Sequence, residues 1–130
     1  MLGRKVISAM LLALLGTGAA VAEPAATEAM PVGFDELTQG RNLAAIAEIK
    51  NNTAVSADDP ARLINLAIAY AREGETDRAS THFRAALHSE ERASLQTAMG
   101  EWVDSRELAR QGLKRLARGD FRDESFASLR

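Results

Sequence analysis

The sequence predicts an all-α protein built from short helical hairpins. Apolar side chains recur every three or four positions in residues 42–50, 60–87 and 104–118, which is the spacing of one helix face. Turn glycines and N-capping residues stand at the ends of these segments. Residues 94–103 have no helical stripe and contain the turn signal Gly100, so we expect a small β-hairpin or an ordered loop there.

The first 22 residues have the three parts of a secretion signal. Arg4 and Lys5 form a basic start, residues 6–15 are apolar, and an A-x-A cleavage signature ends at Ala22. A membrane anchor is the alternative, but a spanning helix needs about 20 continuous apolar residues, and residues 16–18 (Gly-Thr-Gly) interrupt this run. We therefore expect cleavage after Ala22, a periplasmic product and no stable membrane span after cleavage.

Three regions follow the predicted signal peptide. Residues 23–33 contain two prolines and no apolar period, which is typical of a disordered leader. Residues 34–93 should form the helical hairpins. Residues 94–130 should form the loop or small hairpin and a C-terminal capping helix, with Phe121, Phe126 and Leu129 as weak anchors.

The first hairpin is predicted to be short. It consists of a helix at 34–39, a turn at Gly40 and a second helix at 42–50. Four residues of this second helix are expected to share one side: Leu43, Ile46, Ala47 and Lys50.

The second hairpin has the clearest boundaries. Asp59 is a predicted N-cap, and Pro60 occupies the first helical position, where its missing N–H costs nothing. This helix should run over residues 60–72 and be closed by Gly74.

The partner helix should run over residues 77–88, with Thr76 as its N-cap. Phe83 is expected to face Ala67 and Tyr70 across the hairpin, with small alanines allowing the two backbones to approach closely.

A capping box predicts the last helix. Asp104 is the N-cap, Glu107 stands at the third helical position, and Gly119 ends the helix. Gly112 costs about 1 kcal/mol in helix propensity relative to Ala, which predicts a close backbone neighbour. Trp102 is expected to be the largest buried group of this cap. The apolar face is Leu108, Ala109, Gly112, Leu113, Leu116 and Ala117.

Composition excludes several classes of function. The chain has no cysteine, which removes disulfides, thiolate metal sites and lipidated cysteines. Its net charge of −2 becomes more negative without Arg4 and Lys5, which does not favour nucleic acid. Enzymatic signatures such as phosphate loops and G-x-S-x-G are absent from the sequence. His82 and His88 lie about 240° apart around one predicted helix, so they cannot share a metal. We expect no enzyme activity, cofactor or metal.

Residues 60–87 resemble a tetratricopeptide repeat (TPR). The match rests on Leu63, Leu66, Ala67 and Tyr70 in the first helix, on Gly74 in the turn, and on Ala79, Phe83 and Ala86 in the second helix. Glu91 stands where the family has a terminal proline. Residues 34–51 look like a degenerate preceding repeat, and residues 100–116 are similar to the C-terminal segment of small exported TPR-like proteins of uncharacterised function from alphaproteobacteria. The resemblance implies a short stack of about one and a half repeats, which needs a cap or a partner because three repeats are normally required.

The resemblance also implies a groove lined by first helices that binds a protein or peptide of the cell envelope. Its positions here are Ala61, Ile64, Asn65, Ile68, Ala71 and Arg72, and all of them except Ala71 are assigned to the partner site. Asn65 matches a position that often holds a peptide backbone in the family. The apolar residues Ala61, Ile64 and Ile68 favour an apolar partner over a free carboxylate. Alternatively, Ile64 and Ile68 are covered by the first hairpin or the last helix and belong to the core.

A second function of a different class remains open. The last helix carries five cationic residues, which could dock on anionic lipid or polysaccharide: Arg106, Arg110, Lys114, Arg115 and Arg118. An ordinary solvated helix face gives the same pattern. The sequence also leaves homo-oligomerisation open as a way to complete the stack.

Overall fold

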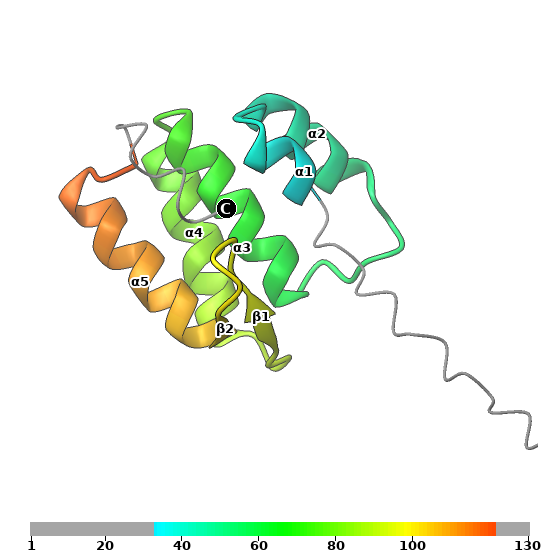
Figure 1. The fold of residues 1–130 in the computed structure, drawn as a ribbon, viewed down its shortest axis with the longest axis vertical. Helices are drawn as coiled ribbons and strands as arrows, with labels where there is room; N and C mark the ends of the chain where they lie inside the picture. The colour runs from blue at the N-terminus through cyan, green and yellow to red at the C-terminus, as the bar shows by residue number, and fades with distance from the viewer. Residues whose placement is uncertain (1–32, 122–130) are drawn as a thin grey trace, which may run out of the picture.

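The computed structural model describes residues 33–121, so the predicted signal peptide, most of the leader and residues 122–130 lie outside the described part. The fold is mostly helical, with one two-stranded sheet (Figure 1). Its elements are α1 (Phe34–Thr38), α2 (Asn42–Asn51), α3 (Pro60–Arg72), α4 (Thr76–His88), β1 (Ser94–Gln96), β2 (Trp102–Asp104) and α5 (Ser105–Arg118).

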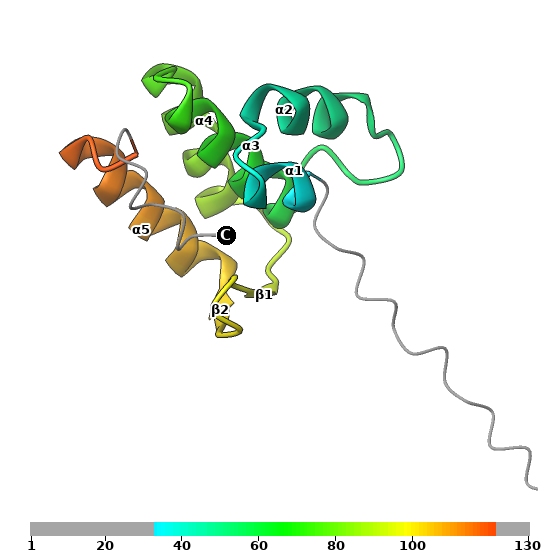
Figure 2. The same ribbon diagram turned by 45° about the horizontal axis from the view of Figure 1, so that its top comes forward.

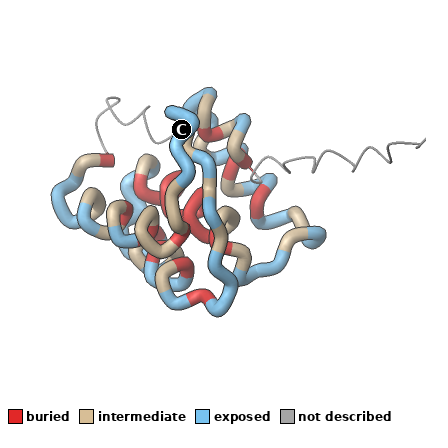
Figure 3. Tube along the Cα trace, turned by 60° about the horizontal axis from the view of Figure 1, so that its bottom comes forward, coloured by how far each residue is buried: buried red, intermediate tan, exposed pale blue. Residues whose placement is uncertain are grey.

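Helix α3 is the centre of the molecule. It packs with α4, and Figures 1 and 2 show α1 and α2 on one side of this pair and α5 on the other. All positions of α3 from Leu63 to Ala71 are buried, and the buried residues gather along the middle of the molecule (Figure 3). A helix that must bury more than one face is apolar nearly all round, as this one is.

The predicted boundaries of α3 are confirmed. Asp59 Oδ1 accepts a hydrogen bond from the backbone N–H of Arg62 at 2.8 Å, and Pro60 occupies the first turn. The guanidinium of Arg62 donates to the carbonyls of Asn52 and Val55, which holds the connector against the helix. Gly74 follows with φ 80°, the left-handed conformation that glycine adopts without steric cost.

We expect Asp59→Ala to lower the free energy of unfolding by about 1 kcal/mol, because one N–H at the start of α3 loses its acceptor. Chemical denaturation followed by circular dichroism measures this change. Asp58→Ala is the matched control, since Asp58 is bonded through its backbone carbonyl, to Ser89 Oγ at 2.9 Å. Equal losses in the two variants would show that the Asp59 cap contributes nothing specific.

Two details of the helical hairpins differ from the prediction. Thr76 is the first residue of α4 rather than its cap, and the preceding Glu75 makes no side-chain cap hydrogen bond. In α2 the buried residues are Ala45 and Ile49, whereas Leu43 is 66% exposed. The predicted side of α2 was therefore wrong. The helix turns Ala45 and Ile49, rather than Leu43, toward α3.

The expected β-hairpin at 94–103 is confirmed and extends one residue further. Strands β1 and β2 are antiparallel, with Leu95 opposite Val103 and Gln96 opposite Trp102. Gly100 in the turn has φ 81°. Asp104 ends β2 and also caps α5, since its Oδ1 accepts from the Arg106 N–H at 3.0 Å.

The cap formed by α5 is built around different aromatic residues than expected. Trp102 is 58% exposed, so it is not the buried anchor of the cap. Phe121 takes that part: it is 4% exposed, and its ring centroid lies 5.9 Å from that of Phe83. Trp102 is the first residue of the three-residue strand β2, next to the turn, and its register partner Gln96 is also exposed.

Gly112 marks a close approach, as predicted, but the neighbour is a side chain. A Cβ placed on Gly112 would lie 2.3 Å from Cε1 of the Phe83 ring. Phe83 is 1% exposed and fills the space between α4 and α5. The missing side chain of Gly112 therefore makes room for an aromatic ring rather than for a second backbone.

Within residues 33–121, no helix combines the length and the apolar character that crossing a membrane requires.

Candidate binding groove

A groove opens over α3 between α1, β1 and α5. About 630 Å³ of space between its walls is free of atoms, and this figure includes open solvent. Its lining comes from α1 (Phe34, Leu37), α3 (Ala61, Ile64, Asn65, Ile68), α4 (Phe83), the hairpin (Leu95, Gln96, Thr97) and α5 (Leu108, Gly112).

Four of the five residues assigned to a partner site from sequence line this groove. Ala61, Ile64, Asn65 and Ile68 stand at positions i, i+3, i+4 and i+7 of α3, which one face of a helix brings together. They form the floor of the groove.

The fifth residue, Arg72, does not line the groove. Its Nη1 donates to the carbonyl of Leu37 at 2.9 Å and so links the end of α3 to α1. The bond holds α1 in place as one wall of the groove.

Little of the groove floor is exposed to solvent. Ile64 is 5% exposed and Ile68 is 6% exposed, so neighbouring elements cover most of both side chains. The sequence left open whether Ile64 and Ile68 line a groove or belong to the core. Both apply, because these isoleucines are part of the core and also present a strip of their surface to the groove. Both of the elements that the sequence named as covers contribute walls, α1 on one side and α5 on the other.

The walls were not predicted as site residues. Phe34 and Leu37 on α1 and Leu108 on α5 lie on helices flanking α3, and their apolar spacing in the sequence is compatible with core as well as with a groove. Nothing in the sequence indicated that β1 would line the groove. The position of the hairpin relative to α3 depends on the chain reversal that follows α4. Leu95, Gln96 and Thr97 close this end of the groove.

Among residues 33–121, no charged residue lines the groove. Asn65, Gln96 and Thr97 provide its polar side chains, and the other lining residues are apolar. Burying an unpaired charge is costly, whereas an apolar side chain gains free energy on entering such a space. The chemistry of the lining therefore suits an uncharged segment with apolar side chains.

The strongest electrostatic effects lie outside the groove. A hydrogen bond from Arg92 lowers the pKa of Asp104 at the start of α5. Glu36 and Glu48 share a side-chain hydrogen bond that lowers the pKa of Glu36 and raises that of Glu48. None of these four residues belongs to the groove lining.

The two histidines are far from a metal-binding arrangement. His82 Nδ1 lies 2.7 Å from the carbonyl of Arg78, and the His82 ring packs 5.3 Å from the ring of Tyr70. His88 is exposed at the end of α4. Over residues 33–121, no three His, Cys, Asp or Glu side chains gather where they could hold a metal ion.

Several of the cationic side chains of α5 form ion pairs or hydrogen bonds within the protein. Arg110 pairs with Glu107 and Arg118 with Asp120, each at 3.3 Å. Arg106 is partly buried and its Nη2 donates to the carbonyl of Ser89 at 3.1 Å. Arg115 is also partly buried, and Lys114 is exposed. The five residues therefore do not form one uniform cationic surface.

Comparison with known proteins gave no match to a family model, to a curated protein sequence or to a solved structure.

Proposed function

We propose that this protein is a non-enzymatic, TPR-like interaction module of the cell envelope that binds an apolar peptide or protein segment in the groove over α3. The observation that supports it is the convergence of Ala61, Ile64, Asn65 and Ile68 on the floor of one uncharged groove. The predicted export signal supports a periplasmic partner.

The order of helices agrees with this proposal. In a helical-hairpin stack the first helices of successive hairpins line one face, and here the groove is walled by α1 and α5 with α3 between them. In this interpretation α1 and α2 are the degenerate repeat, α3 and α4 the complete repeat, and α5 the cap. Such a stack is short, because three repeats are normally needed.

Recognition in this groove would depend on shape and apolar contact. Asn65 is 9% exposed and carries the polar side chain of the floor. Gln96 and Thr97 offer further polar groups at the β1 end. This division matches ligand sites in general, which are mostly apolar with a few polar groups that fix orientation.

The cationic face of α5 supports a function less well. Two of its five charges are compensated by nearby carboxylates and two are partly buried. Exposed ion pairs of this kind are common on solvated helices. We therefore propose the groove, rather than an anionic lipid or polysaccharide surface, as the functional site.

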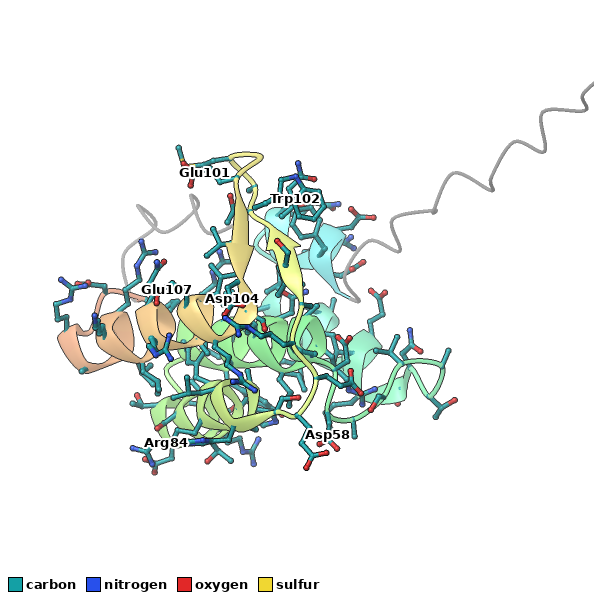
Figure 4. The ribbon with its side chains drawn as sticks, turned by 90° about the horizontal axis from the view of Figure 1, so that it is seen from below. Asp58, Arg84, Glu101, Trp102, Asp104 and Glu107 are labelled. Atoms are coloured by element: carbon teal, nitrogen blue, oxygen red, sulfur yellow. The ribbon has the colours of Figure 1, made fainter. Side chains whose placement is uncertain are left out.

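Site-specific crosslinking in cells tests the proposal. A photo-crosslinking residue replaces Ala61, which is only partly buried and lines the groove. The control replaces Arg84, an exposed residue of α4 that lies on the opposite side of the molecule from the hairpin (Figure 4). We expect position 61 to capture a defined set of envelope proteins that position 84 does not capture.

Gln96→Glu in the same experiment should reduce the capture, because it adds a charge to an uncharged groove at an exposed position that does not support the core. Identical capture from positions 61 and 84, or capture that Gln96→Glu leaves unchanged, would contradict a groove-based function.

A further inference from the structure

The chain reverses direction where α5 ends. Gly119 adopts φ 73°, and the N–H of Asp120 donates to the carbonyl of Arg115 at 3.0 Å. This is the hydrogen-bond pattern of a glycine-terminated helix whose chain folds back. Asp120 is also paired with Arg118 at 3.3 Å, which holds the turn.

The reversed chain is anchored beside the groove. Phe121, the last described residue, is 4% exposed and packs on the ring of Phe83. Phe83 in turn is part of the groove lining. Phe121, the residue before the segment 122–130, therefore contacts a residue of the groove lining.

The length of this segment is sufficient to cover the groove. Along α5 the groove residues Leu108 and Gly112 lie at most ten residues before Arg118, which is about 15 Å at 1.5 Å per residue. Nine extended residues span roughly 30 Å. Residues 122–130 can therefore run back over α3 to the hairpin with length to spare.

The order of residues in this segment matches the groove. Its first three residues are charged (Arg122, Asp123 and Glu124) and suit the solvated region around the end of α5. The next five are uncharged and contain Phe126 and Leu129 within the run Ser-Phe-Ala-Ser-Leu. An uncharged segment carrying two large apolar side chains has the chemistry that an uncharged apolar lining selects.

We propose that residues 122–130 occupy the groove, with Phe126 and Leu129 against its apolar lining, and that an outside peptide binds by displacing them. The occupancy itself depends only on the groove and the segment. The competition with an outside peptide rests on the proposed function. The apparent affinity for an outside peptide is proportional to the fraction of molecules whose groove is not occupied by this segment. Binding would therefore be restricted to partners that fit the groove better than the segment does.

Engineered disulfides test the occupancy directly, because the chain has no cysteine of its own. In the full chain, Gln96→Cys is combined with Leu129→Cys, and disulfide formation under mild oxidation is followed by alkylation and mass measurement. The control combines Arg84→Cys with Leu129→Cys. We expect the 96–129 disulfide to form roughly tenfold faster or more, because a docked segment raises the effective concentration of one thiol at the other.

A second pair of variants separates specific docking from a merely nearby chain. Phe126→Asp should slow formation of the 96–129 disulfide to the rate of the 84–129 control, since a carboxylate is excluded from the apolar lining. Ser125→Asp adds the same charge at a neighbouring position and should have the smaller effect. Equal rates for the 96–129 and 84–129 pairs would overturn the proposal. A faster disulfide between Gln96→Cys and Met30→Cys would also overturn it, and would assign the groove to the N-terminal leader.

The crosslinking experiment distinguishes this inference from the proposed function. Phe126→Asp should increase capture of envelope proteins from position 61, because the competitor is removed. A fast 96–129 disulfide without any capture in either protein would support the occupancy and contradict the peptide-binding function. Capture that Phe126→Asp leaves unchanged would contradict the competition.

Discussion

Phe83→Ala is expected to lower the free energy of unfolding by about 3–5 kcal/mol, the usual cost of removing a buried aromatic ring. Phe83 is 1% exposed and contacts elements on several sides, including Phe121 and the backbone at Gly112. Small domains have total stabilities of about 5–15 kcal/mol, so the loss is a large part of the whole. Thermal unfolding followed by circular dichroism should show a melting temperature lower by roughly 10 °C or more.

Leu43→Ala is the control for this substitution. Leu43 is a large apolar residue of α2, but it is 66% exposed, and it should change the melting temperature little. A loss below about 1 kcal/mol for Phe83→Ala would mean that the ring is not the central contact between α4 and α5.

Gly112→Ala should destabilise the fold although alanine is the better helix former. The gain in helix propensity is about 1 kcal/mol, whereas forcing a methyl group into a packed core costs about 1–3 kcal/mol. The added Cβ would lie 2.3 Å from Cε1 of the buried Phe83 ring, so the ring or the helix must shift. We therefore expect a net loss of stability, measured by denaturant unfolding.

Two further variants isolate the cause. Ala117→Gly changes the same propensity at an exposed position of α5 and gives its size without a steric term. Gly112→Ala combined with Phe83→Leu should be less damaging than the sum of the two single changes, because the smaller side chain leaves room for the methyl group. Strict additivity in this double-mutant cycle would show that the Gly112–Phe83 contact is not what makes alanine unfavourable.

The elements of this fold could be predicted from local signals in the sequence. The cap at Asp59, the proline at position 60 and the turn glycine at position 74 define α3 and its end, and the structure places them as expected. The capping residue Asp104 and the terminal glycine at position 119 define α5 in the same way. Interactions of this kind lie within a few residues along the chain, so a sequence states them directly.

The packing of the elements was harder to predict, as Leu43 and Trp102 show. Trp102 was expected to be buried and Leu43 to share one side of its helix with Ile46, yet the structure leaves both residues mostly exposed. Which face of α2 meets α3 depends on the connector at 52–59, and the position of Trp102 depends on the orientation of the whole hairpin. These are long-range properties, and hydrophobicity alone does not determine them.

The candidate site was predictable to a similar extent. The spacing of Ala61, Ile64, Asn65 and Ile68 identified one face of α3, and the structure brings these residues together on the groove floor. Arg72 continued the same spacing, but its long side chain reaches the carbonyl of Leu37 instead. The walls on α1, β1 and α5 required the tertiary arrangement.

The exposure of Trp102 has a spectroscopic consequence. It is the only tryptophan of the chain, it is 58% exposed, and it stands opposite Gln96 in the strand register. Its fluorescence in the native protein should be red-shifted and quenched readily by iodide or acrylamide, as for an indole in water. Because Gln96 lines the groove, a segment that settles against β1 would shield the indole and shift its emission to the blue, which makes the native chain its own optical sensor of groove occupancy.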